Sequence, residues 1–189
     1  MNDPNNDLKD ADKKKFNNIL IEINKKNFAF AISELLLIIK NYPKNFKLHF
    51  TLGSLYAHTK NLEFAEKYLK LAINLKSDDS KSYYNLGAVL KEREKTKEAK
   101  SFFNKALEIE PNYIHALLGI GKIFEEEKNL LEAKKFYEKT LSLDINHKLA
   151  NLFYGKILVK LNEHKKGLYH IHKASGIIRF NKNSYENQT

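Results

Sequence analysis

The chain repeats itself at a spacing of 34 residues. Glycine recurs at this spacing in four copies: Gly53, Gly87, Gly121 and Gly155. A second series of small residues keeps the same register: Ala31, Ala65, Ala99, Ala133 and Gly167. A repeat of this length is one supersecondary unit that cannot bury its apolar face alone, so it buries it against the neighbouring copies. The sequence therefore predicts a core formed by stacked repeats.

One copy, the stretch from Ser80 to Asn112, shows the pattern of the others. Its first half places apolar residues and a glycine at helical spacing: Tyr83, Leu86, Gly87 and Leu90. A polar break follows at residues 94–96, and a second apolar stripe runs from Ala99 to Ile109 before Pro111. This pattern predicts two short amphipathic helices joined by a turn.

The recurring small residues have a physical meaning. Glycine inside a helix costs about 1 kcal/mol relative to alanine, so its regular recurrence predicts a close approach of two helices. The second series lies one turn before a large residue in three copies: Leu69, Phe103 and Tyr137. We expect small side chains to pack against large ones across this contact.

A Lys-Asn pair recurs between the predicted helices, at residues 26–27, 60–61 and 128–129. Asparagine tolerates the left-handed conformation that a tight turn needs, and its side chain can cap the following helix. We therefore expect the asparagine to occupy the left-handed position. At the start of the chain, we expect Asp10 or Asp12 to cap the first helix.

The period and these residues resemble the tetratricopeptide repeat. The resemblance implies an all-α solenoid of about five helix-turn-helix repeats, wound as a right-handed superhelix. The repeats would span five ranges: 12–45, 46–79, 80–113, 114–147 and 148–181. We expect residues 1–11 to form a disordered polar amino terminus and residues 182–189 a polar tail.

Composition limits the class of protein. The chain has no cysteine, which excludes disulfides and thiolate metal sites and suits a reducing compartment. The amino terminus has no apolar core typical of a signal peptide, and the longest strictly apolar run, Leu35 to Ile39, is too short to cross a bilayer. We expect a cytoplasmic protein. Its 33 basic and 23 acidic residues give a net charge of +10, which favours acidic partners.

Motifs for catalysis are absent from the sequence. It contains no phosphate-binding loop, no G-x-G-x-x-G and no H-E-x-x-H. Glu125, Glu126 and Glu127 are consecutive and therefore point in different directions around a helix. His170 and His172 are two residues apart and do not share a helical face. We expect a protein without catalytic activity, cofactor or metal.

The resemblance also implies where a ligand would bind. In this family the first helix of each repeat lines the concave face, and the register places ligand-facing residues in four repeats: Lys47, Phe50, Thr51, Ser54 and His58; Lys81, Tyr84, Asn85, Ala88 and Lys91; His115, Leu118, Gly119 and Lys122; Leu149, Leu152, Phe153 and Lys156. Lysines recur beside apolar groups. This pattern favours a partner peptide or helix with carboxylates and one or two apolar anchors, whereas the alternative is that Phe50 and Leu118 only pack between repeats.

Tetratricopeptide co-chaperones that bind a terminal carboxylate use a defined set of lysine, asparagine and arginine positions. Only Asn85 matches that set, so the sequence disfavours this subfamily. Asn85 is expected instead to hold an extended backbone through its amide.

Two other functions stay open. A targeting or regulatory subunit could dock through the apolar segment Gly176–Phe180, or that segment could cap the last repeat. The basic surface could bind nucleic acid, although the chain has only two arginines, Arg93 and Arg179.

Overall fold

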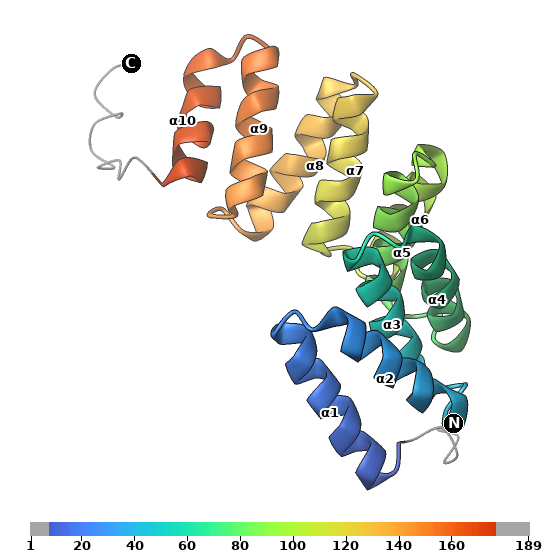
Figure 1. The fold of residues 1–189 in the computed structure, drawn as a ribbon. Coiled ribbons are helices and arrows are strands. Elements are labelled where there is room, and N and C mark those ends of the chain that lie inside the picture. The colour runs from blue at the N-terminus through green and yellow to red at the C-terminus, as the bar shows by residue number, and fades with distance from the viewer. Residues whose placement is uncertain (1–7, 177–189) are drawn as a thin grey trace. The chain divides into compact units, whose positions relative to one another are not determined.

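The computed structural model describes residues 8–176. The expectations for residues 1–7 and 177–189 lie outside this range, including those for the tail and for most of the Gly176–Phe180 segment. The described residues form ten α-helices and no strand (Figure 1): α1 (Asp10–Asn24), α2 (Phe28–Asn41), α3 (Phe46–His58), α4 (Leu62–Leu75), α5 (Ser80–Glu92), α6 (Thr96–Ile109), α7 (Ile114–Glu126), α8 (Leu130–Leu143), α9 (Lys148–Lys160) and α10 (His164–Ser175). The prediction of an all-α solenoid of helix-turn-helix repeats is confirmed.

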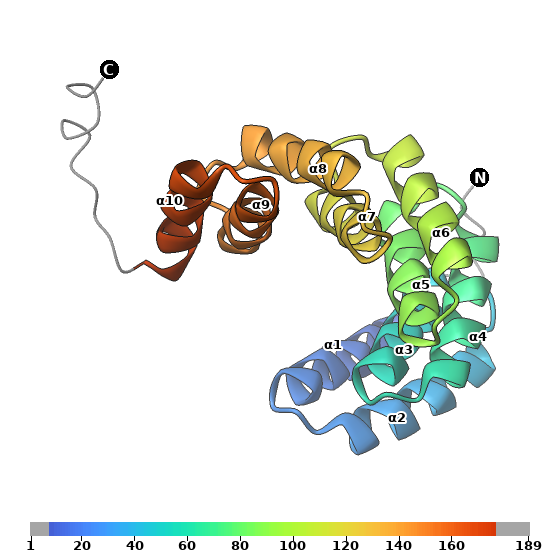
Figure 2. The same ribbon diagram turned by 90° about the horizontal axis from the view of Figure 1, so that it is seen from above.

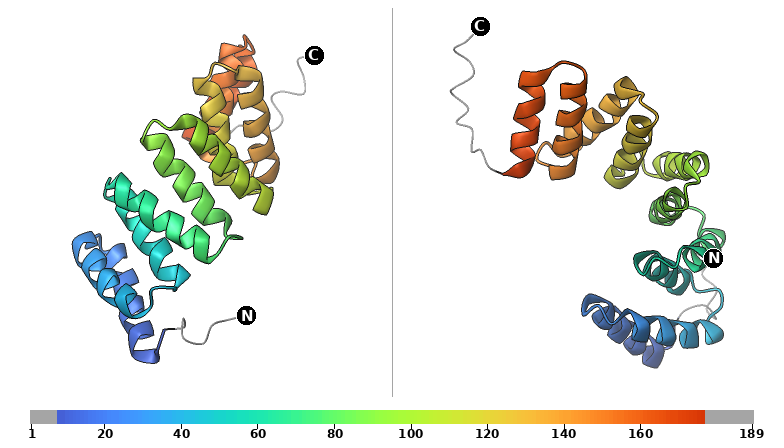
Figure 3. Two further views of the ribbon diagram at one scale, coloured as in Figure 1. Left: turned by 90° about the vertical axis from the view of Figure 1, so that its right-hand side faces the viewer. Right: turned by 45° about the horizontal axis from the view of Figure 1, so that its top comes forward.

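The helices belong to two compact units. Unit 1 spans Met1–Ile109 and contains α1 to α6, and unit 2 spans Glu110–Thr189 and contains α7 to α10. In unit 1 each helix packs against the next as far as α6, and α3 also contacts α5 (Figure 2). In unit 2 the contacts run from α7 to α8, from α8 to α9 and from α9 to α10 (Figure 3). Within each unit, the two helices of a repeat therefore pack against each other, and consecutive repeats of the same unit pack through α2 and α3, α4 and α5, and α8 and α9.

Close helix contacts form at the recurrent glycines, as the sequence predicts. A Cβ atom on Gly121 of α7 would lie 2.6 Å from Cε1 of Tyr137 in α8. In α9 and α10 two glycines face each other, and a Cβ atom on Gly155 would lie 2.6 Å from the carbonyl oxygen of Gly167. Contacts this short leave no room for a side chain, so glycine is the residue that permits them.

The turn between the two helices of a repeat corrects the sequence prediction. The left-handed residue is not the asparagine but the residue before it, with φ of 65° at Lys26, 63° at Lys60 and 61° at Lys128. The physical reason is the way the first helix ends. The Asn61 amide donates to the Tyr56 carbonyl and the Lys60 amide to the Ala57 carbonyl, and this Schellman pattern requires the left-handed conformation at Lys60.

The asparagines of these turns lie at the N-caps of the following helices. Asn129 confirms the predicted capping, because its side-chain oxygen accepts a hydrogen bond from the Glu132 amide at 3.3 Å. Asn27 and Asn61 are N-cap residues without a side-chain cap bond.

The capping prediction for the first helix is wrong. Its N-cap residue is Lys9, and Asp10 and Asp12 lie within the first turn of α1. Asp12 instead accepts a hydrogen bond from the Tyr42 hydroxyl at 2.8 Å. This bond ties α1 to the end of α2.

Candidate peptide-binding surface

A hollow lies between the carboxy-terminal halves of α3 and α5 in unit 1. It measures about 520 Å³ and is lined by eight residues: Ser54, Ala57, His58, Lys60, Asn85, Ala88, Val89 and Glu92. Four of them are ligand-facing residues expected from the sequence: Ser54, His58, Asn85 and Ala88. The side chains of Ser54, Ala57 and Ala88 are small, which leaves the space that makes the hollow.

Polar groups with defined partners surround this hollow. Nδ2 of Asn85 donates to Oγ of Ser54 at 2.9 Å, which links α5 to α3. Nζ of Lys60 donates to both carboxylate oxygens of Glu92, at 2.9 and 2.8 Å. Both members of this ion pair are exposed, so the pair contributes little to stability and can exchange partners. The hollow therefore offers amide, hydroxyl and charged groups of both signs.

The amino-terminal halves of α3 and α5 contribute exposed lysines and half-buried rings. Lys47 and Lys81 are exposed and form no ion pair with the described residues. Phe50 stacks on Phe46 with ring centroids 5.8 Å apart, and the Tyr84 ring lies 5.6 Å from that of Phe103. Burial raises the pKa of Tyr84. The two other candidates in these helices, Thr51 and Lys91, are half-buried.

In unit 2, Glu125 forms ion pairs with one lysine of α7 and one lysine of α9. One of its oxygens accepts a hydrogen bond from Lys160 at 2.8 Å, and the other accepts one from Lys122 at 3.3 Å. The Tyr137 hydroxyl also donates to Glu125, at 3.4 Å. Burial raises the pKa of Glu125, but the hydrogen bond from Lys160 and the charges of both lysines outweigh it, so the pKa is lowered overall.

The Glu125 cluster changes the role expected of Lys122. Its ammonium group is already paired with Glu125 and lies 5.4 Å from the centroid of the Phe153 ring. Phe153 in turn packs on Tyr137, with ring centroids 5.6 Å apart. Lys122 and Phe153 are therefore close to each other, as the register implies, but their main contacts are within the protein.

The remaining candidates of unit 2 differ in exposure. Leu149 and Lys156 are exposed, Leu152 and Gly119 are half-buried, and His115 is exposed beside the Tyr113 ring. Leu118 is only 8% exposed and lies in the core with Tyr137 and Ile157. Leu118 therefore agrees with the alternative that the sequence left open, in which it packs between repeats, because residues of α8 and α9 surround it.

Four residues of the hollow were missed from the sequence: Ala57, Lys60, Val89 and Glu92. Ala57 and Glu92 could have been found by extending the register, because each lies within one helical turn of an expected residue, Ser54 or Ala88. Lys60 lies in the turn after α3, so a pattern based on helical positions does not include it.

In the described part of the chain, no group of three or more His, Asp or Glu side chains is placed to hold a metal ion. Over the same residues, no helix is long and apolar enough to span a membrane.

Comparison with known families decides the classification. One sequence profile of the tetratricopeptide repeat matches residues 80–113, and a second matches residues 46–79 and 114–147. The chain belongs to the tetratricopeptide repeat family. The matched ranges cover three consecutive repeats and contain α3 to α8.

Solved structures share the fold of this tetratricopeptide repeat chain at low sequence identity. MamA from Desulfovibrio magneticus RS-1, solved from its residue 41 to the end, is 17% identical with a TM-score of 0.77, and the alignment covers 90% of this chain and 97% of that solved chain. PilF of Pseudomonas aeruginosa is 19% identical with a TM-score of 0.79, covering 89% and 77%. YrrB, a tetratricopeptide repeat protein with an unusual peptide-binding site, is 20% identical with a TM-score of 0.66, covering 86% and 84%. No curated protein matches the sequence.

Proposed function

We propose that the chain is a non-catalytic adaptor that binds a peptide or short helix of a partner protein along α3 and α5. Membership of the tetratricopeptide repeat family supports a protein-interaction scaffold, as does the fold shared with peptide-binding YrrB. The observation that carries the proposal is the hollow between α3 and α5, because four residues expected to face a ligand line it together.

The chemistry of this surface favours a partner segment with both acidic and apolar side chains. The Asn85 amide can accept and donate hydrogen bonds to an extended backbone. Lys47 and Lys81 attract carboxylates, and the half-buried rings of Phe50 and Tyr84 offer apolar contact. Charge would guide the encounter, while the buried apolar area would supply most of the affinity.

The experiment fills the hollow without changing the exposed lysines. In Ala88→Arg a long side chain occupies the space between α3 and α5. The matched control is Ser101→Arg, which adds the same side chain at an exposed position of α6. Native chain and both variants are used as bait in the source cell, with a photo-crosslinker at Thr51.

We expect a crosslinked partner with the native chain and with Ser101→Arg, and its loss with Ala88→Arg at unchanged helicity. Equal capture by all three baits would overturn the groove proposal. The crosslinked segment also tests the chemistry, because a strongly basic segment would contradict the expected acidic and apolar character.

A further inference from the structure

Large apolar side chains are exposed in a row on each of two helices of unit 1, α2 and α4. Phe30 and Leu37 form a row on α2, and Phe64 and Leu71 form a row on α4, with Leu75 one turn further on. Each of these five side chains is between 37% and 54% exposed. We call them the outer rows. The 34-residue period relates Phe30 to Phe64 and Leu37 to Leu71, so the two helices present the same positions of the repeat.

The other repeats show that the fold does not require apolar residues at these positions. The equivalent pairs are Glu98 and Lys105 in α6, Glu132 and Lys139 in α8, and Lys166 and Lys173 in α10. Three repeats thus form the same helix pair with charged side chains. One residue of the outer rows, Phe64, has a ring contact within its own repeat, because it stacks on Tyr56 with ring centroids 5.2 Å apart. This contact explains in part why position 64 is apolar. The exposure of the other apolar groups has no explanation within the repeat.

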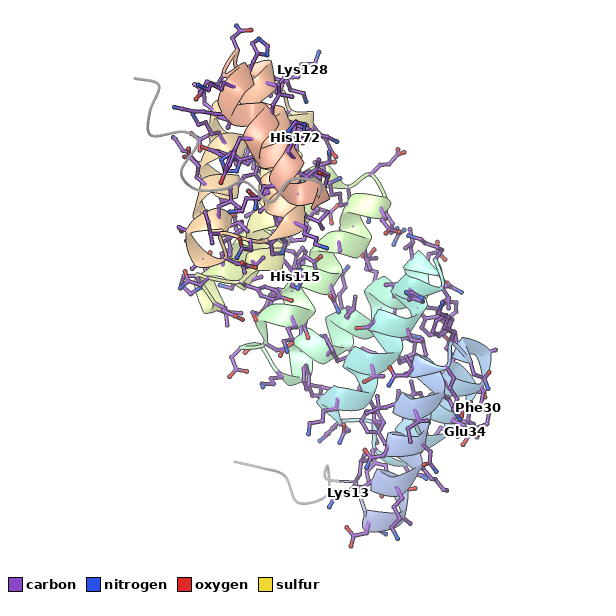
Figure 4. The ribbon with its side chains drawn as sticks, turned by 90° about the vertical axis from the view of Figure 1, so that its left-hand side faces the viewer. Lys13, Phe30, Glu34, His115, Lys128 and His172 are labelled. Atoms are coloured by element: carbon purple, nitrogen blue, oxygen red, sulfur yellow. The ribbon has the colours of Figure 1, made fainter. Side chains whose placement is uncertain are left out.

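The outer rows are separate from the hollow described above. They lie on the second helices of their repeats, whereas the hollow lies between the first helices α3 and α5. Figure 4 shows Phe30 together with Glu34 on one side of α2. Phe30 also borders a second hollow of about 400 Å³ between α1 and α2, where Ile21 is exposed as well. This hollow offers a place for one apolar anchor of a ligand.

The outer rows offer enough apolar area to dock one helix. Half-exposed side chains of this size show roughly 100 Å² each, so the five offer on the order of 500 Å². A stable protein dimer buries about 800 Å² on each partner, of which a little over half is apolar, so the area alone does not distinguish a helix from a second copy of the chain. Within each row the spacing is seven residues, or two helical turns, which matches the i and i+7 anchors of an amphipathic helix.

The charged residues around the outer rows indicate which polar residues the ligand helix should carry. Exposed lysines lie beside the rows at Lys40, Lys67 and Lys76, against two glutamates, the exposed Glu63 and the half-buried Glu34, so positive charge is in excess. A second copy would bring the same lysines and the same net charge of +10, which opposes association. A helix with acidic residues beside its apolar face complements this surface.

We propose that the outer rows of α2 and α4 are a second docking site, which binds an acidic amphipathic helix of a partner protein. The site is independent of the hollow between α3 and α5. The chain would then hold two partner segments at once, one on the first helices and one on the second helices of unit 1.

The test replaces the outer rows with the residues that the fourth repeat carries at the same positions. The variant Phe30→Glu, Leu37→Lys, Phe64→Glu, Leu71→Lys leaves the net charge unchanged, so long-range attraction stays the same. The probe is a synthetic helical peptide of about four turns, with leucines on one face and glutamates beside them. A matched peptide has lysines in place of the glutamates. Binding to the full chain is measured by fluorescence anisotropy, and circular dichroism checks that helicity is kept.

We expect the glutamate peptide to bind the native chain at least about tenfold more tightly than it binds the fourfold variant, and at least about tenfold more tightly than the lysine peptide binds the native chain. Because the groove is itself proposed to bind acidic segments, the fourfold change is also measured in the Ala88→Arg background, in which the hollow is filled, and the tenfold loss should persist there. This separates a failure of the outer rows from a failure of the groove.

Equal affinity of native chain and fourfold variant would overturn the proposal. So would light scattering that shows a native dimer and a monomeric variant, because the second copy would then be the ligand. Cosedimentation of the native chain, but not the variant, with anionic lipid vesicles would assign the rows to a membrane surface and would also overturn it.

Discussion

Glu125 is the centre of one polar cluster in unit 2. Its side chain is only 10% exposed, and it holds Lys122, Lys160 and the Tyr137 hydroxyl around one carboxylate. A buried carboxylate is stable only when such partners compensate for its lost hydration. Here Lys122 comes from the same helix as Glu125, Lys160 from α9 and Tyr137 from α8, so the cluster links three helices.

Replacing Glu125 by glutamine should make stability less dependent on pH. The pKa of Glu125 is lowered in the folded chain from its ordinary value of 4.5, so the fold favours the carboxylate. The contribution of the carboxylate to the free energy of unfolding is complete above pH 4.5, and it is lost as pH falls through the lowered pKa. We expect Glu125→Gln to lower the free energy of unfolding by about 2 kcal/mol at pH 7, with a smaller difference below pH 4.5. Urea unfolding at several pH values measures this. A difference that stayed constant down to pH 2 would contradict it.

Glu94 shows backbone strain at a single residue. It is a non-glycine residue in the left-handed region, with φ of 62°, a conformation that costs an L-residue about 1 kcal/mol. Glu94→Gly should raise the free energy of unfolding by about 0.5–1 kcal/mol. The control Ser101→Gly places glycine at an exposed position inside α6, where it should lower the free energy of unfolding by about 0.5 kcal/mol. Chemical denaturation compares the two variants, and stabilisation by both or by neither would disagree with this account.

At the scale of helix pairs, α9 and α10 make the contact that depends most on small residues. A Cβ atom on Gly155 would lie 2.6 Å from the Gly167 carbonyl oxygen and 2.9 Å from the Ile171 amide nitrogen. Backbone atoms cannot turn away as a side chain can, so the helices themselves must separate. We expect Gly155→Ala to destabilise the pair by about 2–3 kcal/mol, while the exposed control Lys156→Ala has little effect. Amide hydrogen exchange in α9 and α10 measures this, and unchanged protection would show that the helices tolerate the methyl group.

The sequence predicts the helix pairs well because their packing rules are local. The recurrence of glycine every 34 residues predicts a close approach of two helices, and Gly121 makes this approach with Tyr137. The left-handed lysines were not predicted, because the Schellman bonds that select Lys60 depend on where the helix ends. The burial of Leu118 was one of two alternatives that the sequence left open, since it depends on how residues of α8 and α9 pack around it. Which of the ligand-facing residues are exposed likewise depends on how neighbouring helices pack, and the sequence of one helix does not show this.

For the whole molecule, the net charge of +10 is the main long-range property. Part of the basic charge is already paired, as with Lys134 and Glu163 at 2.8 Å. Arg93, the one arginine among the described residues, pairs with the buried Glu66. Two other lysines, Lys70 and Lys95, also lie within ion-pair distance of Glu66. The guanidinium group that most often reads bases and phosphates is therefore occupied within the protein.

These pairings predict how the chain responds to nucleic acid. The unpaired lysines should bind duplex DNA through phosphates alone, without base recognition. Such binding weakens steeply as salt rises, because it depends on counterion release. We expect measurable affinity at about 0.02 M salt and none at about 0.15 M, where charges are screened beyond about 8 Å. Fluorescence anisotropy with duplexes of two unrelated sequences tests this, and an affinity that survived 0.15 M salt or differed between the duplexes would require a specific site. Loss of binding with salt would instead mean that the net charge supplies only long-range attraction, so that a selective site on this chain needs apolar contact beside the charge.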